Sequence, residues 1–231
     1  MARFRTVFLL ISLLSAATGT ILAQDGEDSV VAEPYAIEGI VDAFSLLATD
    51  GQEYGLHSFS DADGVILIFT GNTCPCAEGY ETRINWLDKT YKAKGWPVLA
   101  VNSNKAERQH GDGFEDMKQQ ALEGSWTYPY LIDEDQELAK AYGALRTPHA
   151  FVLQRVGEDF KLIYEGAIDN RPYDAYRVTR HYVAEVIEAA IKGNRPPIRQ
   201  VPPAGCAIEG ISELPRECPI ESKIARKVGQ Q

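Results

Sequence analysis

Positive charge is scarce in this chain of 231 residues: 23 lysines and arginines stand against 33 aspartates and glutamates, a formal net charge of −10. Binding to nucleic acid without sequence preference, or to anionic membranes, needs a basic face, so we set both classes aside. Cysteine is scarce as well, and four cysteines are too few to staple a chain of this length as a disulfide scaffold. No glycine-rich nucleotide-binding loop is apparent. The 45% of hydrophobic residues is the proportion typical of a globular domain with an ample core.

The apolar run near the start is too short to cross a bilayer, which needs about 20 apolar residues. Arg3 and Arg5 precede this run at 7–17, and the first acidic residue after it is Asp25. A basic start, a short apolar run and small residues at a cleavage point are typical of a secretory signal peptide. We therefore predict a signal peptide at 1–23, export to the periplasm or the outside, and no stable membrane insertion.

Residues 41–193 alternate between strand-like and helix-like patterns. Apolar runs of strand length occupy 65–69, 98–101, 130–132, 150–153 and 161–164, and helical patterns occupy 80–91, 113–123, 137–142 and 173–192. The order β-α-β-α followed by β-β-α predicts an α/β domain with a central mixed sheet and helices on both faces. We interpret 24–40 as an acidic flexible lead-in, and 194–231 as a proline-rich tail on the surface with two cysteines.

Cys74 stands where a buried strand meets a helix, in the sequence Thr73-Cys74-Pro75-Cys76. If Pro75 is the first helical residue, Cys74 is the N-cap. A thiol there faces unsatisfied backbone N–H groups and the positive end of the helix dipole, which stabilise a thiolate. This position predicts a reactive nucleophile.

A second feature is Thr147-Pro148, directly before the predicted hairpin that returns beside the first buried strand. That return would bring the pair close to Cys74. Position alone leaves the state of the peptide bond open, because only about 5–6% of X–Pro bonds are cis.

Several stretches together resemble the thioredoxin superfamily, and within it the peroxiredoxin-like redoxin group related to the alkyl hydroperoxide reductase/thiol-specific antioxidant family. The matching stretches are 69–80, 100–104, 128–133, 139–144 with 147–148, 164–170 and 203–208. The resemblance implies a thioredoxin-like three-layer fold. It also implies that Cys74 is the nucleophile, that Pro148 is the cis-proline facing it, and that the backbone at Thr147 is offered to a substrate peptide.

The chain departs from both family patterns at informative places. The second cysteine of thioredoxin would fall at Ala77, whereas this chain has Cys76. The peroxiredoxin motif would need proline and threonine where Leu67 and Gly71 stand. Arg146 either resembles the arginine that stabilises a peroxidatic thiolate or is a surface arginine at the start of a loop.

The cysteine pairing has two arrangements. We predict that Cys206 and Cys218 form a structural disulfide that fixes the tail, because an unpaired Cys218 would be exposed in an oxidising compartment. Cys76 would then resolve Cys74. The competing arrangement joins Cys206 to Cys74, makes the tail part of the catalytic cycle and favours a two-cysteine peroxidase.

The favoured function is an exported thiol–disulfide oxidoreductase that uses Cys74 on a protein thiol or disulfide, with no cofactor or metal and an electron donor that is not identified. The first alternative is a thiol peroxidase acting on a small-molecule peroxide. The second is a copper(I) carrier with Cys74, Cys76 and His149 as ligands, since soft thiolate and imidazole donors suit that ion.

Overall fold

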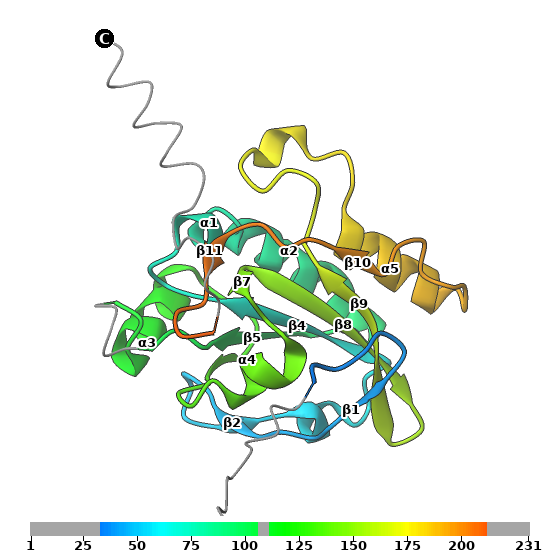
Figure 1. Cartoon of the computed structure of the whole chain (residues 1–231), viewed down its shortest axis with the longest axis horizontal. Helices are drawn as coiled ribbons and strands as arrows, with labels where there is room; N and C mark the ends of the chain where they lie inside the picture. Colours follow the sequence, from blue (N-terminus) through cyan, green and yellow to red (C-terminus); the bar gives the residue numbers. More distant parts are fainter. Residues whose placement is uncertain (1–32, 106–110, 212–231) are drawn as a thin grey trace, which may run out of the picture. The chain divides into compact units, whose positions relative to one another are not determined.

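The computed structural model describes residues 33–105 and 111–211 (Figure 1). The strands are β1 (Ile40–Val41), β2 (Leu46–Leu47), β3 (Glu53–Tyr54), β4 (Gly64–Thr70), β5 (Val98–Asn102), β6 (Tyr130–Ile132), β7 (Arg146–Thr147), β8 (His149–Val156), β9 (Asp159–Gly166), β10 (Gln200–Val201) and β11 (Cys206–Ala207). The α-helices are α1 (Pro75–Glu78), α2 (Glu81–Tyr91), α3 (Phe114–Glu123), α4 (Glu137–Tyr142) and α5 (Tyr182–Ile191), with 3-10 turns η1 (Leu56–Phe59), η2 (Lys92–Lys94) and η3 (Ala175–Arg177). Among these residues no helix has the length and apolar character needed to span a membrane.

The main sheet has the order β1-β9-β8-β4-β5-β6, with β10 added beside β9. Strands β4, β5 and β6 are parallel, whereas β8 and β9 form an antiparallel hairpin that pairs with β4. Every residue of β4 is buried, as expected for a central strand covered on both faces. The mixed sheet predicted from the order of elements is therefore confirmed.

Helices cover both faces of this sheet and make the three layers that the resemblance implied (Figure 1). Successive residues of β4 alternate between two buried clusters, because neighbouring side chains of a strand point to opposite faces. The cluster with α2 and α5 includes Ile66, Ile68, Ile84, Leu87, Val183 and Ile187. The cluster with α4 includes Val65, Leu67, Phe69, Leu138, Tyr142 and Ile208.

Strand directions bring two distant loops to one edge of the sheet. The loop that leads to α1 leaves β4 after Thr70. Strand β8 runs antiparallel to β4, and its first residue, His149, pairs with Phe69 near the end of β4. The segment just before β8 therefore lies beside the loop that follows β4, which is the neighbourhood predicted for the Thr147-Pro148 pair.

The sequence analysis predicted that the tail lies on the surface. In the structure the tail instead pairs with two strands of the domain. Strand β10 pairs in parallel with the end of β9, and β11 pairs antiparallel with β7. Cys206, Ala207 and Ile208 are all buried. Figure 1 shows β10 beside β9 and β11 next to α1. Two short strand pairings thus carry the tail back to the loops at the sheet edge.

The last helix is shorter than predicted: α5 starts at Tyr182, whereas the predicted helix covered 173–192. The Asn170 carboxamide oxygen accepts hydrogen bonds from two backbone N–H groups just before the helix and folds this segment into a loop. Tyr176 is fully exposed, so no buried stripe supports a helix there.

Residues 35–40, assigned to a flexible lead-in, are attached to the domain. The backbone N–H of Tyr35 donates to Ala141 O, and that of Glu38 donates to Leu162 O. The predicted signal peptide at 1–23 lies outside the described residues.

Candidate active site

Cys74 occupies the helix start that the sequence predicted. It is the N-cap of α1, with Pro75 as the first helical residue, and the N–H of Ala77 donates to its sulfur at 3.4 Å. The side chain is only 3% exposed. The helix start thus directs a backbone donor at a sulfur atom that solvent hardly reaches.

The predicted proline loop faces this cysteine. The Thr147–Pro148 peptide bond is cis, and Thr147 O lies 3.1 Å from Cys74 Sγ. The neighbourhood of Cys74, Thr147 and Pro148 that the resemblance implied is therefore present.

Cys206 is bonded to Cys74, with their Cα atoms 6.0 Å apart. The predicted Cys206–Cys218 disulfide is therefore wrong in this structure, because Cys206 already has its partner; Cys218 itself lies outside the described residues. The reason is tertiary: β10 and β11 return the tail to the sheet edge, which spacing along the chain could not reveal. The arrangement that the sequence analysis held as the competing one is the one observed.

Cys76 belongs to the same cluster of sulfur atoms. The sulfurs of Cys74, Cys76 and Cys206 all lie within 4.8 Å of one another, and Cys76 has no exposed surface. These three residues and Ala77 form a small buried cluster of their own. Any exchange at the Cys74–Cys206 bond therefore takes place next to a third sulfur.

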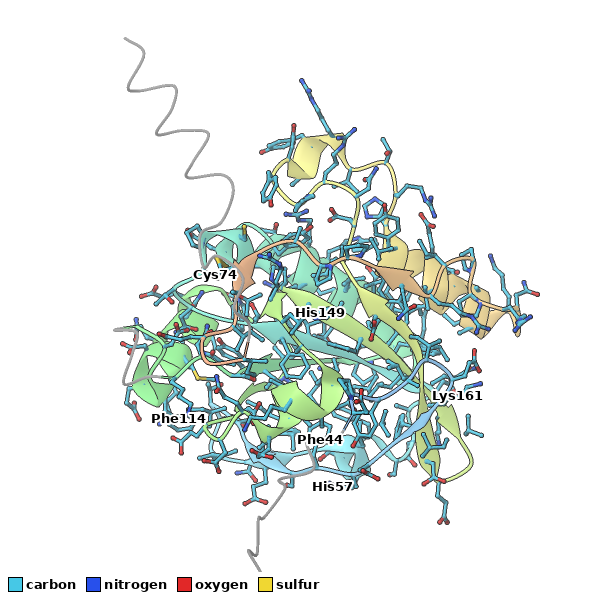
Figure 2. All side chains as sticks on the ribbon, in the orientation of Figure 1. Phe44, His57, Cys74, Phe114, His149 and Lys161 are labelled. Atoms are coloured by element: carbon cyan, nitrogen blue, oxygen red, sulfur yellow. A yellow bond between two sulfur atoms is a disulfide. The ribbon has the colours of Figure 1, made fainter. Side chains whose placement is uncertain are left out.

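His149 is not part of this cluster, so the predicted ligand set of two cysteines and this histidine is corrected. In the described part of the chain, the one group suited to a metal consists of the three cysteines. Figure 2 labels Cys74 near α1 and His149 on β8. Burial lowers the pKa of His149 to about 3, and its ring lies 4.4 Å from that of Phe151. His149 is a neutral core side chain.

Arg146 holds the tail. Its Nη1 donates to Gly205 O at 2.5 Å, in the residue just before Cys206. The sequence analysis weighed a thiolate-stabilising role against a surface position. The hydrogen bond gives this half-buried arginine a further role, which is to fix the strand that carries the second cysteine.

Sequence reasoning missed Asp112, which is completely buried. Its carboxylate accepts hydrogen bonds from the N–H of Asn72 at 2.7 Å and from the Thr73 hydroxyl at 2.5 Å. The Asn102 amide also donates to it, at 3.0 Å. Asp112 thus positions the two residues that lead into Cys74. No periodic pattern surrounds it, so the sequence offered no signal for this role.

Gly205 was also missed, although it stands directly before a cysteine. A Cβ atom at this position would lie 1.9 Å from Thr147 O. Only glycine lets the tail approach the proline loop this closely.

A thioredoxin-like fold, a cysteine at a helix start facing a cis-proline, and a disulfide from that cysteine define a protein of the thiol-redox class. The profile of the AhpC/TSA family matches residues 37–158, more than half of the chain. The chain belongs to the AhpC/TSA family, in agreement with the resemblance noted from the sequence.

Relatives agree with this assignment. The thiol-disulfide oxidoreductase ResA of Geobacillus thermodenitrificans is 29% identical over 159 residues, which cover 69% of this chain and 84% of that protein. Two solved structures are similar with a TM-score of 0.69 each. A hypothetical protein from Sinorhizobium meliloti is 30% identical and covers 75% of this chain and 94% of its own. An uncharacterized conserved protein from Geobacillus kaustophilus is 32% identical and covers 75% and 92%. Together with the cysteine pair, the matches support an oxidoreductase enzyme.

Proposed function

We propose that this protein catalyses thiol–disulfide exchange, with Cys74 as the attacking thiolate and Cys206 as the resolving thiol. The observation that carries the proposal is the Cys74–Cys206 disulfide beside the backbone of Thr147. The similarity to thiol-disulfide oxidoreductases named ResA supports it.

The exchange has two steps. The Cys74 thiolate attacks one sulfur of a substrate disulfide, forms a mixed disulfide and releases the other substrate sulfur as a thiolate. The Cys206 thiolate then attacks Cys74 Sγ, forms the Cys74–Cys206 bond and releases the second substrate thiolate. The substrate gains two electrons from the enzyme. A dithiol donor then reduces the Cys74–Cys206 bond by the same exchange in reverse and is itself oxidised to a disulfide.

The substrate is a protein thiol or disulfide, and the reaction takes place after export. The backbone at Thr147 supports a polypeptide substrate, since β7 already pairs with an extended strand there. Export rests on the signal-peptide pattern at 1–23, and an oxidising compartment would keep the pair available as a disulfide.

The test combines disulfide mapping with an exchange assay on full-length variants. Oxidised wild-type protein should yield a peptide pair linked through Cys74 and Cys206. Cys74→Ser should abolish reduction of a protein disulfide such as that of insulin. Cys206→Ser should accumulate the mixed disulfide, while the matched control Cys218→Ser should still form the Cys74–Cys206 disulfide. Full activity of Cys74→Ser would refute the proposal, and full turnover of Cys206→Ser would move the resolving role to Cys76.

A thiol peroxidase is the second candidate, because a two-cysteine peroxidase would end its cycle with the same disulfide and the family includes such enzymes. Two observations argue against it. Gly71 stands where that motif has threonine, so the threonine hydroxyl is absent. Arg146 donates to the tail backbone. We expect peroxide consumption by the reduced protein to be slow relative to exchange with a protein disulfide.

The three clustered sulfurs favour copper(I) binding as a non-enzymatic candidate, with Cys206 in place of His149. Titration of the reduced protein with copper(I), compared with the double variant Cys74→Ser/Cys76→Ser, separates this function from both enzymes. A carrier would lose binding in the double variant and would show no turnover in either assay.

A further inference from the structure

The edge of β7 beside Cys74 is covered by the chain's own tail. Strand β11 pairs with it antiparallel, with Cys206 opposite Thr147 and Ala207 opposite Arg146. The pairing extends one residue further, since the N–H of Ile208 donates to Leu145 O at 3.0 Å. The tail is thus an extended peptide whose cysteine is bonded to the nucleophile.

The backbone of the proline loop leaves no room for a side chain at Gly205, the residue before the tail cysteine. An added Cβ at Gly205 would lie 1.9 Å from Thr147 O and 3.1 Å from the nitrogen of Pro148. Both are backbone atoms of the proline loop and cannot rotate away as a side chain can. The φ angle of Gly205 is outside the left-handed region, so its requirement for glycine comes from contact alone.

The residues after the tail cysteine also sit in defined places. Ala207 is 3% exposed, and Ile208 is completely buried in the cluster formed with α4. The contacts of the tail therefore favour glycine before the cysteine, a small residue after it and an apolar residue next. The tail therefore occupies the β7 edge as a bound peptide would, and its sequence indicates which residues fit there.

We propose that the tail is a built-in copy of the substrate. The β7 edge selects polypeptides whose reacting cysteine directly follows a glycine. This inference rests on the proposed exchange function and names its substrate class. A substrate enters in the register of the reduced tail, its cysteine takes the place of Cys206, and its preceding residue meets the same Thr147 oxygen.

The chemical step is the first step of the proposed exchange. The Cys74 thiolate attacks the sulfur of the peptide cysteine, a Cys74–peptide disulfide forms, and the bond between that sulfur and its former partner breaks. The former partner leaves as a thiolate with the electron pair. No oxidant or reductant beyond the substrate disulfide is needed.

The experiment compares two peptides whose cysteine is activated as a thiopyridyl disulfide. One is Ala-Gly-Cys-Ala-Ile and the other is Ala-Ala-Cys-Ala-Ile. The protein is the full, reduced chain with Cys76→Ser, Cys206→Ser and Cys218→Ser, so that Cys74 is the one thiol that remains and no other sulfur resolves the mixed disulfide. Release of thiopyridone gives the rate. The reaction of each peptide with glutathione corrects for intrinsic reactivity, and dithiodipyridine, which has no backbone, reports on Cys74 itself.

We expect the glycine peptide to react faster than the alanine peptide by at least about tenfold after correction, the size of effect that overpacking against fixed backbone produces. Equal corrected rates would overturn the inference and leave the exchange function standing. The same conclusion follows if dithiodipyridine reacts and neither peptide does. If Cys74 reacts with none of the three probes, the proposed function itself fails.

Discussion

Arg146 illustrates how a single charged side chain can serve a cysteine pair without touching it. Its guanidinium binds a backbone carbonyl in the residue before Cys206. A hydrogen bond from a charged donor to a partly buried acceptor contributes about 1–2 kcal/mol. Arg146 therefore acts as a positioning residue for the strand that carries Cys206.

Replacing Arg146 with alanine should loosen β11 and expose the disulfide. We expect a dithiol to reduce the Cys74–Cys206 bond several-fold faster in Arg146→Ala, because the tail opens more often. The pH dependence of Cys74 alkylation should stay unchanged, since the guanidinium binds Gly205. Arg177→Ala, which removes an exposed arginine paired with Asp174, is the matched control. A clear shift in the alkylation profile would instead support the thiolate-stabilising role.

His149 gives a pH dependence of stability. Burial lowers its pKa in the folded protein to about 3, below the unfolded value of about 6.5. Its contribution is fully present above pH 6.5 and is lost progressively as the pH falls, because the unfolded state takes up the proton first.

Between pH 7 and pH 5 this residue should therefore lower the free energy of unfolding by about 2 kcal/mol. Urea unfolding of the wild type and of His149→Gln measures the effect. The variant should be less stable at pH 7 but should lose less stability on acidification. Parallel losses in the two proteins would contradict a buried neutral His149.

At the scale of elements, β11 is a two-residue strand whose place depends on close contact. Its pairing with β7 adds few hydrogen bonds, and the fit of Gly205 against Thr147 O brings Cys206 to Cys74. A short strand held in this way can separate from its partner without unfolding the main sheet.

Gly205→Ala should push β11 away from the proline loop. We expect slower formation of the Cys74–Cys206 disulfide on oxidation and a loss of about 1–3 kcal/mol in stability from overpacking. Disulfide mapping at timed intervals follows the bond. The control is Gly157→Ala, where an added Cβ meets no atom within 4 Å and the cost arises only from a φ of 67°. Unchanged oxidation in Gly205→Ala would show that the contact does not govern the approach of the tail.

For the whole molecule, the disulfide joins residues 132 positions apart. Closing so long a loop restricts the unfolded chain much more than a bond within the tail would. The loop-entropy estimate is about 4–5 kcal/mol for the Cys74–Cys206 bond, against about 2–3 kcal/mol for the predicted Cys206–Cys218 bond.

Reduction by a dithiol should therefore lower the free energy of unfolding of the wild type by about 4–5 kcal/mol. Urea denaturation under oxidising and reducing conditions measures the difference. Cys74→Ser should lack the contribution of the Cys74–Cys206 bond, and Cys218→Ser should keep it. If the difference disappears in Cys218→Ser, the result would support the Cys206–Cys218 disulfide predicted from the sequence.

Much of the fold could be predicted because its signals are local. The apolar runs 65–69 and 98–101 are too continuous for a strand with one exposed face, so they predicted buried parallel strands. The turn at 157–159 predicted the hairpin of β8 and β9. The predicted start of α5 was wrong because hydrogen bonds from two backbone N–H groups to the Asn170 side chain outweighed the helical composition of 173–181.

The sequence by itself determined the setting of the proposed nucleophile: Cys74 at a helix start and Pro148 at the strand that returns beside it. These follow from Pro75, from the run before it and from the order of elements. Only the tertiary structure decided the partner of Cys74, the position of His149 and the roles of Asp112 and Gly205. Each of these depends on contacts between segments that are distant in the chain, and spacing in a sequence carries no record of such contacts.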